Sequence, residues 1–289
     1  MAASNTLTVE PIDATFGAVI TGLRLADLDD AGWADIHALW LEYALLVFPG
    51  QFLTKDQQVA FTRRFGDIEV IADSEIVALS NVKPDGTLRG DDDMVKVLKG
   101  NMGWHADSTY MPLQAKGAVF TAEVVPSQGG GTGWADMRAA YDALDEATRA
   151  RVHELSAHHS LVYSQSKVDH EHSDDSEYFG YGFHDDGVPL RPLVKIHPET
   201  GRPSLLIGRH AYGIPGMEPS ESERFLEGLV EFACQPPRVY EHRWQPGDAV
   251  VWDNRCLLHR ARPWDMSVPR VMWHSRIAGD APSELAETV

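Results

Sequence analysis

The abundance of short strand-like stretches, which outnumber helical patterns in the second half of the chain, is the feature that most constrains the fold. Such stretches lie at residues 118–125, 204–207, 248–252 and 270–277. They do not alternate with helical patterns, which argues against a doubly wound parallel sheet. We therefore expect a mainly β protein with covering helices, built as a double-sheet, cupin-like jelly roll.

The helices are predicted by capping residues and apolar spacing. Asp29 or Asp30 can cap a helix whose apolar face includes Ile36, Leu39, Trp40 and Tyr43. Capping boxes predict two further helices, one at Thr54-x-x-Gln57 and one at Ser220-x-x-Glu223. Residues 45–48 are apolar and precede Pro49-Gly50, which predicts a buried strand.

The length of 289 residues fits one domain covering residues 1–289. Two segments within it, residues 83–98 and 165–188, are expected to be mobile loops, because they are rich in Gly, Asp, Ser or His. Plain surface insertions would have the same composition.

Charge and cysteine content narrow the possible partners. A net charge of −18 argues against nucleic acid and against anionic membranes. The N-terminus lacks the pattern of a signal peptide, and the longest apolar region, 33–49, is interrupted by charged residues. The only cysteines, Cys234 and Cys256, lack a paired-thiol spacing, which favours a reducing cytoplasm. A homo-oligomer is compatible with all of this.

Candidate metal ligands occur in two widely separated segments. Trp104-His105-Ala106-Asp107 is followed, 152 residues after Asp107, by His259. Two imidazoles and one carboxylate can hold Fe(II) on one face and leave the other face open to an organic acid and dioxygen. If residues 105–107 form a strand, His105 and Asp107 point to the same side.

Two other kinds of protein remain possible from these residues alone. The same ligand set suits zinc in a hydrolase, although the chain contains no His-Glu-x-x-His sequence. A non-catalytic jelly-roll binding module is the other possibility, but such a module has no need of all three ligands. The zinc-hydrolase interpretation also leaves Arg270 and Thr132 without a role.

The flanks of these motifs resemble the taurine dioxygenase and 2,4-D dioxygenase family, whose members use Fe(II) and 2-oxoglutarate. The resemblance rests on Asn101–Tyr110, on Gly129-Gly130-Gly131-Thr132-Gly133-Trp134-Ala135-Asp136 and on Trp252–Arg270. It runs from about residue 9 to 279 and implies a double-stranded β-helix. Within the family, residues 162–167, 205–210 and 269–276 are most similar to the (S)-specific phenoxypropionate (dichlorprop and mecoprop) dioxygenases.

The resemblance implies a role for each matching residue. His105, Asp107 and His259 would bind Fe(II), the presence of Asp107 favouring hydroxylation over halogenation. Arg270 and Thr132 would bind the distal carboxylate of 2-oxoglutarate, and Trp252 would line its pocket. Asn101, Arg209 and His210 would contact the substrate.

One position departs from the family pattern. The taurine enzyme has a second arginine four residues after the co-substrate arginine, where it binds the acid group of the substrate. Here that position is His274, and an arginine follows at Arg276. On a strand Arg270, His274 and Arg276 share a face, so Arg276 is a further substrate-binding candidate.

The resemblance implies a dioxygenase that uses Fe(II), 2-oxoglutarate and O2 to hydroxylate C2 of (S)-2-aryloxypropionate herbicides such as dichlorprop and mecoprop. The products would be a phenol, pyruvate, succinate and CO2. The alternative within this class is the same chemistry on taurine, another sulfonate or an alkyl sulfate.

Overall fold

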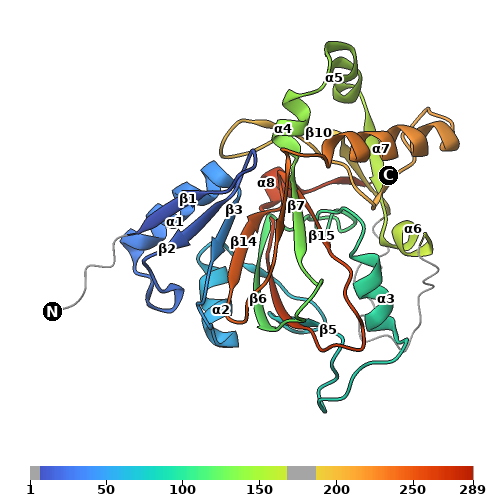
Figure 1. Cartoon of the computed structure of the whole chain (residues 1–289). Coiled ribbons are helices and arrows are strands. Elements are labelled where there is room, and N and C mark those ends of the chain that lie inside the picture. The colour runs from blue at the N-terminus through green and yellow to red at the C-terminus, as the bar shows by residue number, and fades with distance from the viewer. Residues whose placement is uncertain (1–6, 168–186, 289) are drawn as a thin grey trace.

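The computed structural model describes residues 7–167 and 187–288, and its largest element is an eight-stranded sheet (Figure 1). Its order is β1-β2-β3-β14-β6-β16-β4, with β5 also paired to β16. All of its pairings are antiparallel except β2 with β3. The strands are β1 (Thr8–Pro11), β2 (Ala18–Thr21), β3 (Leu45–Phe48), β4 (Ile68–Glu69), β5 (Val77–Ser80), β6 (Gly117–Val124), β14 (Ala249–Asp253) and β16 (Val271–Ile277).

Three smaller antiparallel sheets complete the β structure. The first, β13-β7-β15, consists of Val239–His242, Thr132–Asp136 and Leu257–Ala261. The second, β12-β8-β9-β17, consists of Ala211–Tyr212, Ser156–His159, Pro189–Pro192 and Glu287–Thr288. The third pairs β10 (Val194–Ile196) with β11 (Pro203–Leu205).

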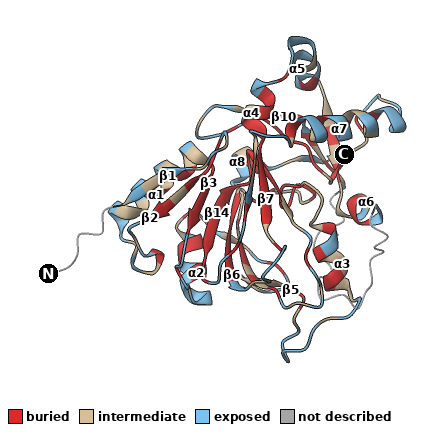
Figure 2. Ribbon diagram, in the orientation of Figure 1, coloured by how far each residue is buried: buried red, intermediate tan, exposed pale blue. Residues whose placement is uncertain are grey.

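The helices lie outside the sheets, and most of them have exposed outward faces, whereas α4 (Met137–Asp142) is largely buried (Figure 2). Helices α1 (Asp30–Tyr43) and α2 (Lys55–Arg63) pack on the large sheet, where Ile36, Trp40, Phe61 and Phe65 join its buried core. Helices α4, α5 and α7 lie together at one end of the molecule, and α3 and α6 lie on the side away from α1 (Figure 1). Their bounds are α3 (Asp93–Gly100), α4 (Met137–Asp142), α5 (Glu146–His153), α6 (Leu161–Ser166), α7 (Pro219–Ala233) and α8 (Ala281–Glu284), with a short 3-10 turn, η1, at Leu25–Asp27.

A second core of aromatic side chains lies between the sheets. Phe120, Trp134, Trp244 and Trp252 are buried and meet edge to face, with ring centroids 5.4–6.4 Å apart. Such pairs add specific geometry to the burial of apolar area. The predicted mainly β jelly roll with covering helices is confirmed. No helix in the described part of the chain has the length and apolarity needed to cross a bilayer.

The local predictions had mixed outcomes. Asp29 caps α1, and Thr54 and Gln57 form both bonds of the expected capping box. The box at Ser220 is wrong, because Glu218 is the N-cap of α7 and Pro219 occupies the first turn. The first expected loop, 83–98, is irregular only to residue 92, where α3 begins after the Asp92 cap. The second, 165–188, lies mostly outside the described residues, and its first two belong to α6.

Candidate active site

The two candidate histidine ligands are joined through their backbones. His105 and His259 form an isolated antiparallel bridge, with N···O distances of 3.0 and 2.7 Å. Their rings lie beside each other, with centroids 4.2 Å apart. The expected strand at 105–107 is therefore reduced to one bridging residue, and the chain enters a turn at Asp107. The bridge itself brings the first motif against strand β15.

Asp107 completes the triad, and Asn254 fixes its backbone. The Asn254 amide accepts from Asp107 N at 2.8 Å and donates to Asp107 O at 2.9 Å. Ligand atoms of His105, Asp107 and His259 all lie within 4.8 Å of one another, and all three residues are buried. Asp107 Oδ2 is buried and has no hydrogen-bond partner among the described residues, which is unusual for a carboxylate oxygen unless it binds a ligand.

The protonation states of the triad suit a metal ion. Burial, aided by nearby His259, holds the pKa of His105 well below its usual range, and burial lowers the pKa of His259 to about 4. Burial raises the pKa of Asp107, but Arg276, His259 and His274 together outweigh it and hold that pKa well below its usual value. The ring of His105 contacts Gly103 O through Nδ1 at 2.8 Å, which leaves Nε2 for the ion. Neutral imidazoles and an ionised carboxylate are the forms that bind a divalent ion.

A second cluster of potential ligands, His197, Asp253 and Cys256, has its donor atoms already occupied. Asp253 accepts from both Arg255 and His197, at distances of 2.6–2.9 Å. The other ring nitrogen of His197 accepts from the backbone of Glu199 and Thr200. Burial raises the pKa of the Cys256 thiol well above its usual value. This cluster is a hydrogen-bonded part of the core, and we do not assign a metal to it.

A pocket extends from the triad into the space between the sheets. Its lining includes the predicted residues Asn101, Thr132, Trp252, Arg270 and Arg276. The other lining residues are Leu79, Leu98, His105, Asp107, Phe120, His259, Ala261 and His274. The structure thus brings the metal motif and the three co-substrate candidates to one cavity.

Arg270 is suited to bind an anion at one end of this pocket. Its side chain is buried and donates through Nε to Gly130 O at 2.9 Å, and no described carboxylate forms an ion pair with it. Burial lowers its pKa to about 10. Thr132 Oγ1 accepts from Trp244 at 2.9 Å, so its own hydrogen is directed elsewhere. Trp252 stacks on His274, with planes 7° apart, and walls the pocket.

The remaining substrate candidates occupy different surroundings. Arg209 lies beside the first metal motif, because its backbone N donates to Trp104 O at 2.8 Å. Its guanidinium donates to Ser164 O at 3.0 Å. His210 bonds to Ser164 Oγ at 2.8 Å and packs edge-on against His105. Neither residue lines the pocket around Arg270. Arg276 does line it, with Nη2 3.2 Å from Asp107 Oδ1.

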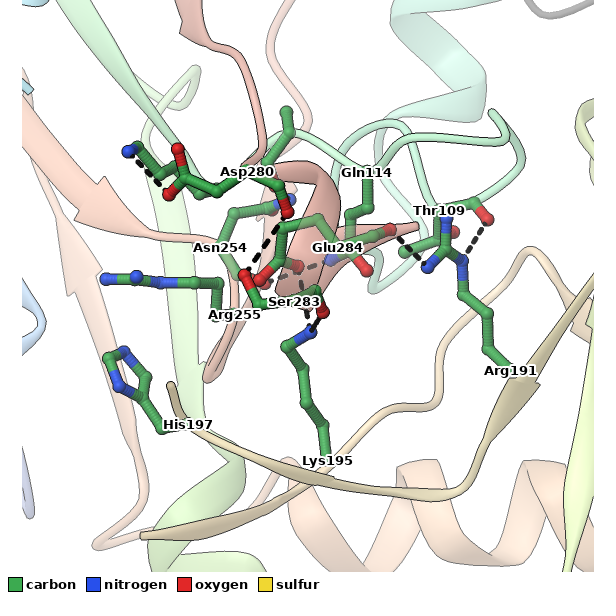
Figure 3. Close-up of polar contacts among 12 residues, drawn as sticks. Thr109, Gln114, Arg191, Lys195, His197, Asn254, Arg255, Asp280, Ser283 and Glu284 are labelled. Carbon is green, nitrogen blue, oxygen red and sulfur yellow. Dashed lines mark hydrogen bonds and ion pairs between the residues drawn. The ribbon is translucent and has the colours of Figure 1, made fainter. Parts of the chain in front are cut away.

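Several residues that support the site were missed from sequence. Arg191 is buried and donates to the carbonyls of Thr109, Met111 and Glu284 at 2.8–3.0 Å, which fixes the segment that follows Asp107 (Figure 3). Lys195 binds α8 through Ser283 O and the Glu284 carboxylate (Figure 3). No sequence signal marked Arg191, because its partners are backbone carbonyls. Asn254 belongs to the Trp252–Arg270 motif, but no sequence pattern indicated that its side chain binds the backbone of Asp107.

Comparison with known proteins agrees with this geometry. A family model described as taurine catabolism dioxygenase TauD, TfdA family matches residues 8–276. An (S)-phenoxypropionate/alpha-ketoglutarate-dioxygenase of Sphingobium herbicidovorans is 70% identical over 282 residues, covering 96% of this chain and 97% of that protein. A protein of the same name from Delftia acidovorans is 65% identical, covering 98% and 99%. The crystal structure of AAD-2 in complex with Mn(II) and N-oxalylglycine matches at a TM-score of 0.87 and 36% identity, covering 96% and 98%. The chain therefore belongs to the TauD, TfdA family of dioxygenases.

Proposed function

We propose that this enzyme uses Fe(II), 2-oxoglutarate and O2 to hydroxylate C2 of (S)-2-aryloxypropionates of the dichlorprop and mecoprop type. The observation that carries the proposal is a pair of guanidinium groups near the triad that have no described carboxylate partner, Arg270 and Arg209. Burial lowers the pKa of each to about 10. Two such cations are expected where two carboxylates bind, one from the co-substrate and one from the substrate. The names of the two relatives above support the substrate class.

The residues of the triad fit iron, since the ligand atoms of two neutral imidazoles lie within 4.8 Å of a buried carboxylate oxygen that has no hydrogen-bond partner in the described part of the chain. Bound Fe(II) would supply, with 2-oxoglutarate and O2, the oxidising power that converts C2–H to C2–OH as succinate and CO2 form. The hydroxylated product is a hemiketal. Its C2–O bond to the aryl oxygen breaks as the hydroxyl proton passes to that oxygen, which gives a phenol and pyruvate.

The chain contributes positioning and exclusion of water. Arg270 and Thr132 would hold the distal carboxylate of 2-oxoglutarate, and Trp252 and Phe120 would keep water away from its carbon chain. Arg209 would bind the substrate carboxylate, with the neighbouring His210 beside it, and Asn101 would contact the substrate from the wall of the pocket. We prefer Arg209 to Arg276 for this role because Arg276 is already paired with Asp107.

The test follows the visible absorption of the anaerobic enzyme with Fe(II) and 2-oxoglutarate. Each dichlorprop enantiomer and taurine is then added in turn, and succinate and phenol are measured after air is admitted. We expect the (S)-enantiomer to shift the band and to yield one phenol per succinate. A shift with taurine alone would reject the substrate class, and the absence of any band would reject the mechanism.

A pair of arginine variants tests the binding of the substrate carboxylate. Arg209→Met should raise the KM for (S)-dichlorprop about 10- to 100-fold, because a hydrogen bond to a charged group contributes about 1.5–3 kcal/mol. Arg202→Met is the control, since Arg202 pairs with Asp142 at an exposed site. An unchanged KM in Arg209→Met would remove Arg209 from the substrate site.

We also propose a cytoplasmic setting. Cys234 and Cys256 are free thiols, and burial raises the pKa of Cys234 to about 12. Thiols of this kind are compatible with a reducing compartment. Fractionation of cells that express the tagged protein tests this.

A further inference from the structure

Arg276 makes polar contacts with a metal ligand and with that ligand's neighbour. Its Nη2 lies 3.2 Å from Asp107 Oδ1, and its Nη1 donates to Ser108 Oγ at 3.2 Å. The side chain is only 12% exposed, so solvent screens these contacts weakly. Arg276 therefore binds the turn that carries Asp107 at two adjacent residues.

Glu69 supports Arg276 from the neighbouring strand. Arg276 and Glu69 are paired in the register of β16 and β4, and Arg276 Nη1 lies 3.9 Å from Glu69 Oε2. Ser108 Oγ in turn donates to Glu69, at 2.7 and 3.0 Å from its two oxygens. The guanidinium is thus placed by β16, Glu69 and Ser108 before any ion binds.

The two oxygens of Asp107 consequently have different surroundings. Oδ1 is bound by Arg276, whereas Oδ2 is buried and accepts no hydrogen bond from residues 7–167 or 187–288. Oδ2 is also the oxygen near the imidazoles, 3.8 Å from His259 Nε2 and 3.5 Å from His274 Nε2. A rotation of the carboxylate that presented both oxygens to one ion would draw Oδ1 away from Arg276 and break that contact.

We propose that Arg276 is a positioning residue that fixes the Asp107 carboxylate so that Oδ2 alone is presented to the metal. This inference rests on the proposed function only in taking His105, Asp107 and His259 as the metal ligands. One-oxygen binding keeps the remaining positions on the ion for 2-oxoglutarate and O2, whereas a bidentate carboxylate would occupy one of them. Partners that orient a ligand in this way commonly contribute 10- to 100-fold to metal affinity.

The experiment measures Co(II) binding to the metal-free full chain by calorimetry, without substrate or co-substrate. Co(II) is chosen because its visible spectrum reports the number of ligands. The variants are Arg276→Gln, Arg276→Lys and Glu69→Gln, with Arg202→Gln as the surface control. We expect Arg276→Gln to weaken Co(II) binding about 10- to 100-fold and to alter the spectrum. Arg276→Lys should recover most of the loss, and Arg202→Gln should match the wild type.

Glu69→Gln tests the outer contact and should weaken binding less than Arg276→Gln. Melting of each metal-free variant establishes that it is folded. If Arg276→Gln keeps the wild-type Co(II) affinity and spectrum but raises the KM for (S)-dichlorprop, Arg276 binds substrate and the inference is overturned. If the wild type itself binds no Co(II), the metal assignment fails, and the proposed function fails with it.

Discussion

Replacing Arg270 by methionine should make the metal-free, ligand-free protein more stable while it removes co-substrate binding. Arg270 is 2% exposed and has no carboxylate partner among the described residues. Methionine is unbranched and apolar, so it fills the space of the alkyl part of the Arg270 side chain without a charge. The substitution therefore separates the cost of the buried charge from its use in binding.

The magnitude follows from the pKa of Arg270. Burial lowers it from its ordinary value to about 10, and each pKa unit corresponds to about 1.4 kcal/mol. The buried charge thus costs about 3 kcal/mol, while the lost bond to Gly130 O is worth about 1 kcal/mol. The ligand-free Arg270→Met protein should gain about 1–2 kcal/mol in its free energy of unfolding.

Two measurements check this reasoning. Urea denaturation gives the free energy of unfolding, and 2-oxoglutarate titration gives the KM, which should rise at least about 100-fold when a buried charged contact of about 3 kcal/mol is lost. Saturating 2-oxoglutarate should stabilise the wild type and leave Arg270→Met unaffected. An Arg270→Met protein with the wild-type KM for 2-oxoglutarate would refute the role of Arg270 in binding. A free energy of unfolding lowered by more than about 2 kcal/mol, as when a buried hydrogen bond is lost, would refute the cost assigned to the buried charge.

Three further outcomes are expected. Asn254→Ala removes three hydrogen bonds of 2.7–2.9 Å and leaves buried backbone groups of Asp107 and Ala115 without a partner. The free energy of unfolding, measured by urea denaturation, should therefore fall by about 3 kcal/mol. A fall of less than about 1 kcal/mol would contradict this. The folded-state pKa values of His259 and His159, about 4 and about 3, lie below the unfolded value near 6.5, so stability should be complete above about pH 6.5 and fall as pH drops toward 4. Flat stability across that range would show that these imidazoles are not buried. Co(II) should raise the Tm of the wild type but not of Asp107→Ala, and equal shifts would place the ion elsewhere.

Sequence reasoning succeeded where a local pattern has one structural solution. Thr54 and Gln57 satisfy each other's backbone groups within one turn, so their capping box could be predicted without the fold. Ser220 fitted the same pattern, but Pro219 is itself suited to the first turn of a helix, so α7 begins at Pro219 with Glu218 as its N-cap. The motif flanks predicted the triad and the placing of Arg270 and Thr132 in its pocket.

What could not be predicted depends on pairing between distant segments. Arg276 lines the pocket, as the strand pattern indicated. Its contact with the Asp107 carboxylate could not be predicted, because it depends on the register of β16 with β4 and β6. The role of Arg191 depends on four backbone carbonyl groups that carry no residue-specific signal. Such contacts emerge only when the sheets have assembled.

The backbone bridge between His105 and His259 also has a consequence for the order of folding. The two residues come from opposite halves of the chain, so their contact closes a long loop and is formed at a high entropic cost. During synthesis, the first motif emerges well before β15 is available. High-affinity capture of the ion would thus await release of nearly the whole chain, and metal loading would report completed folding rather than assist its early steps.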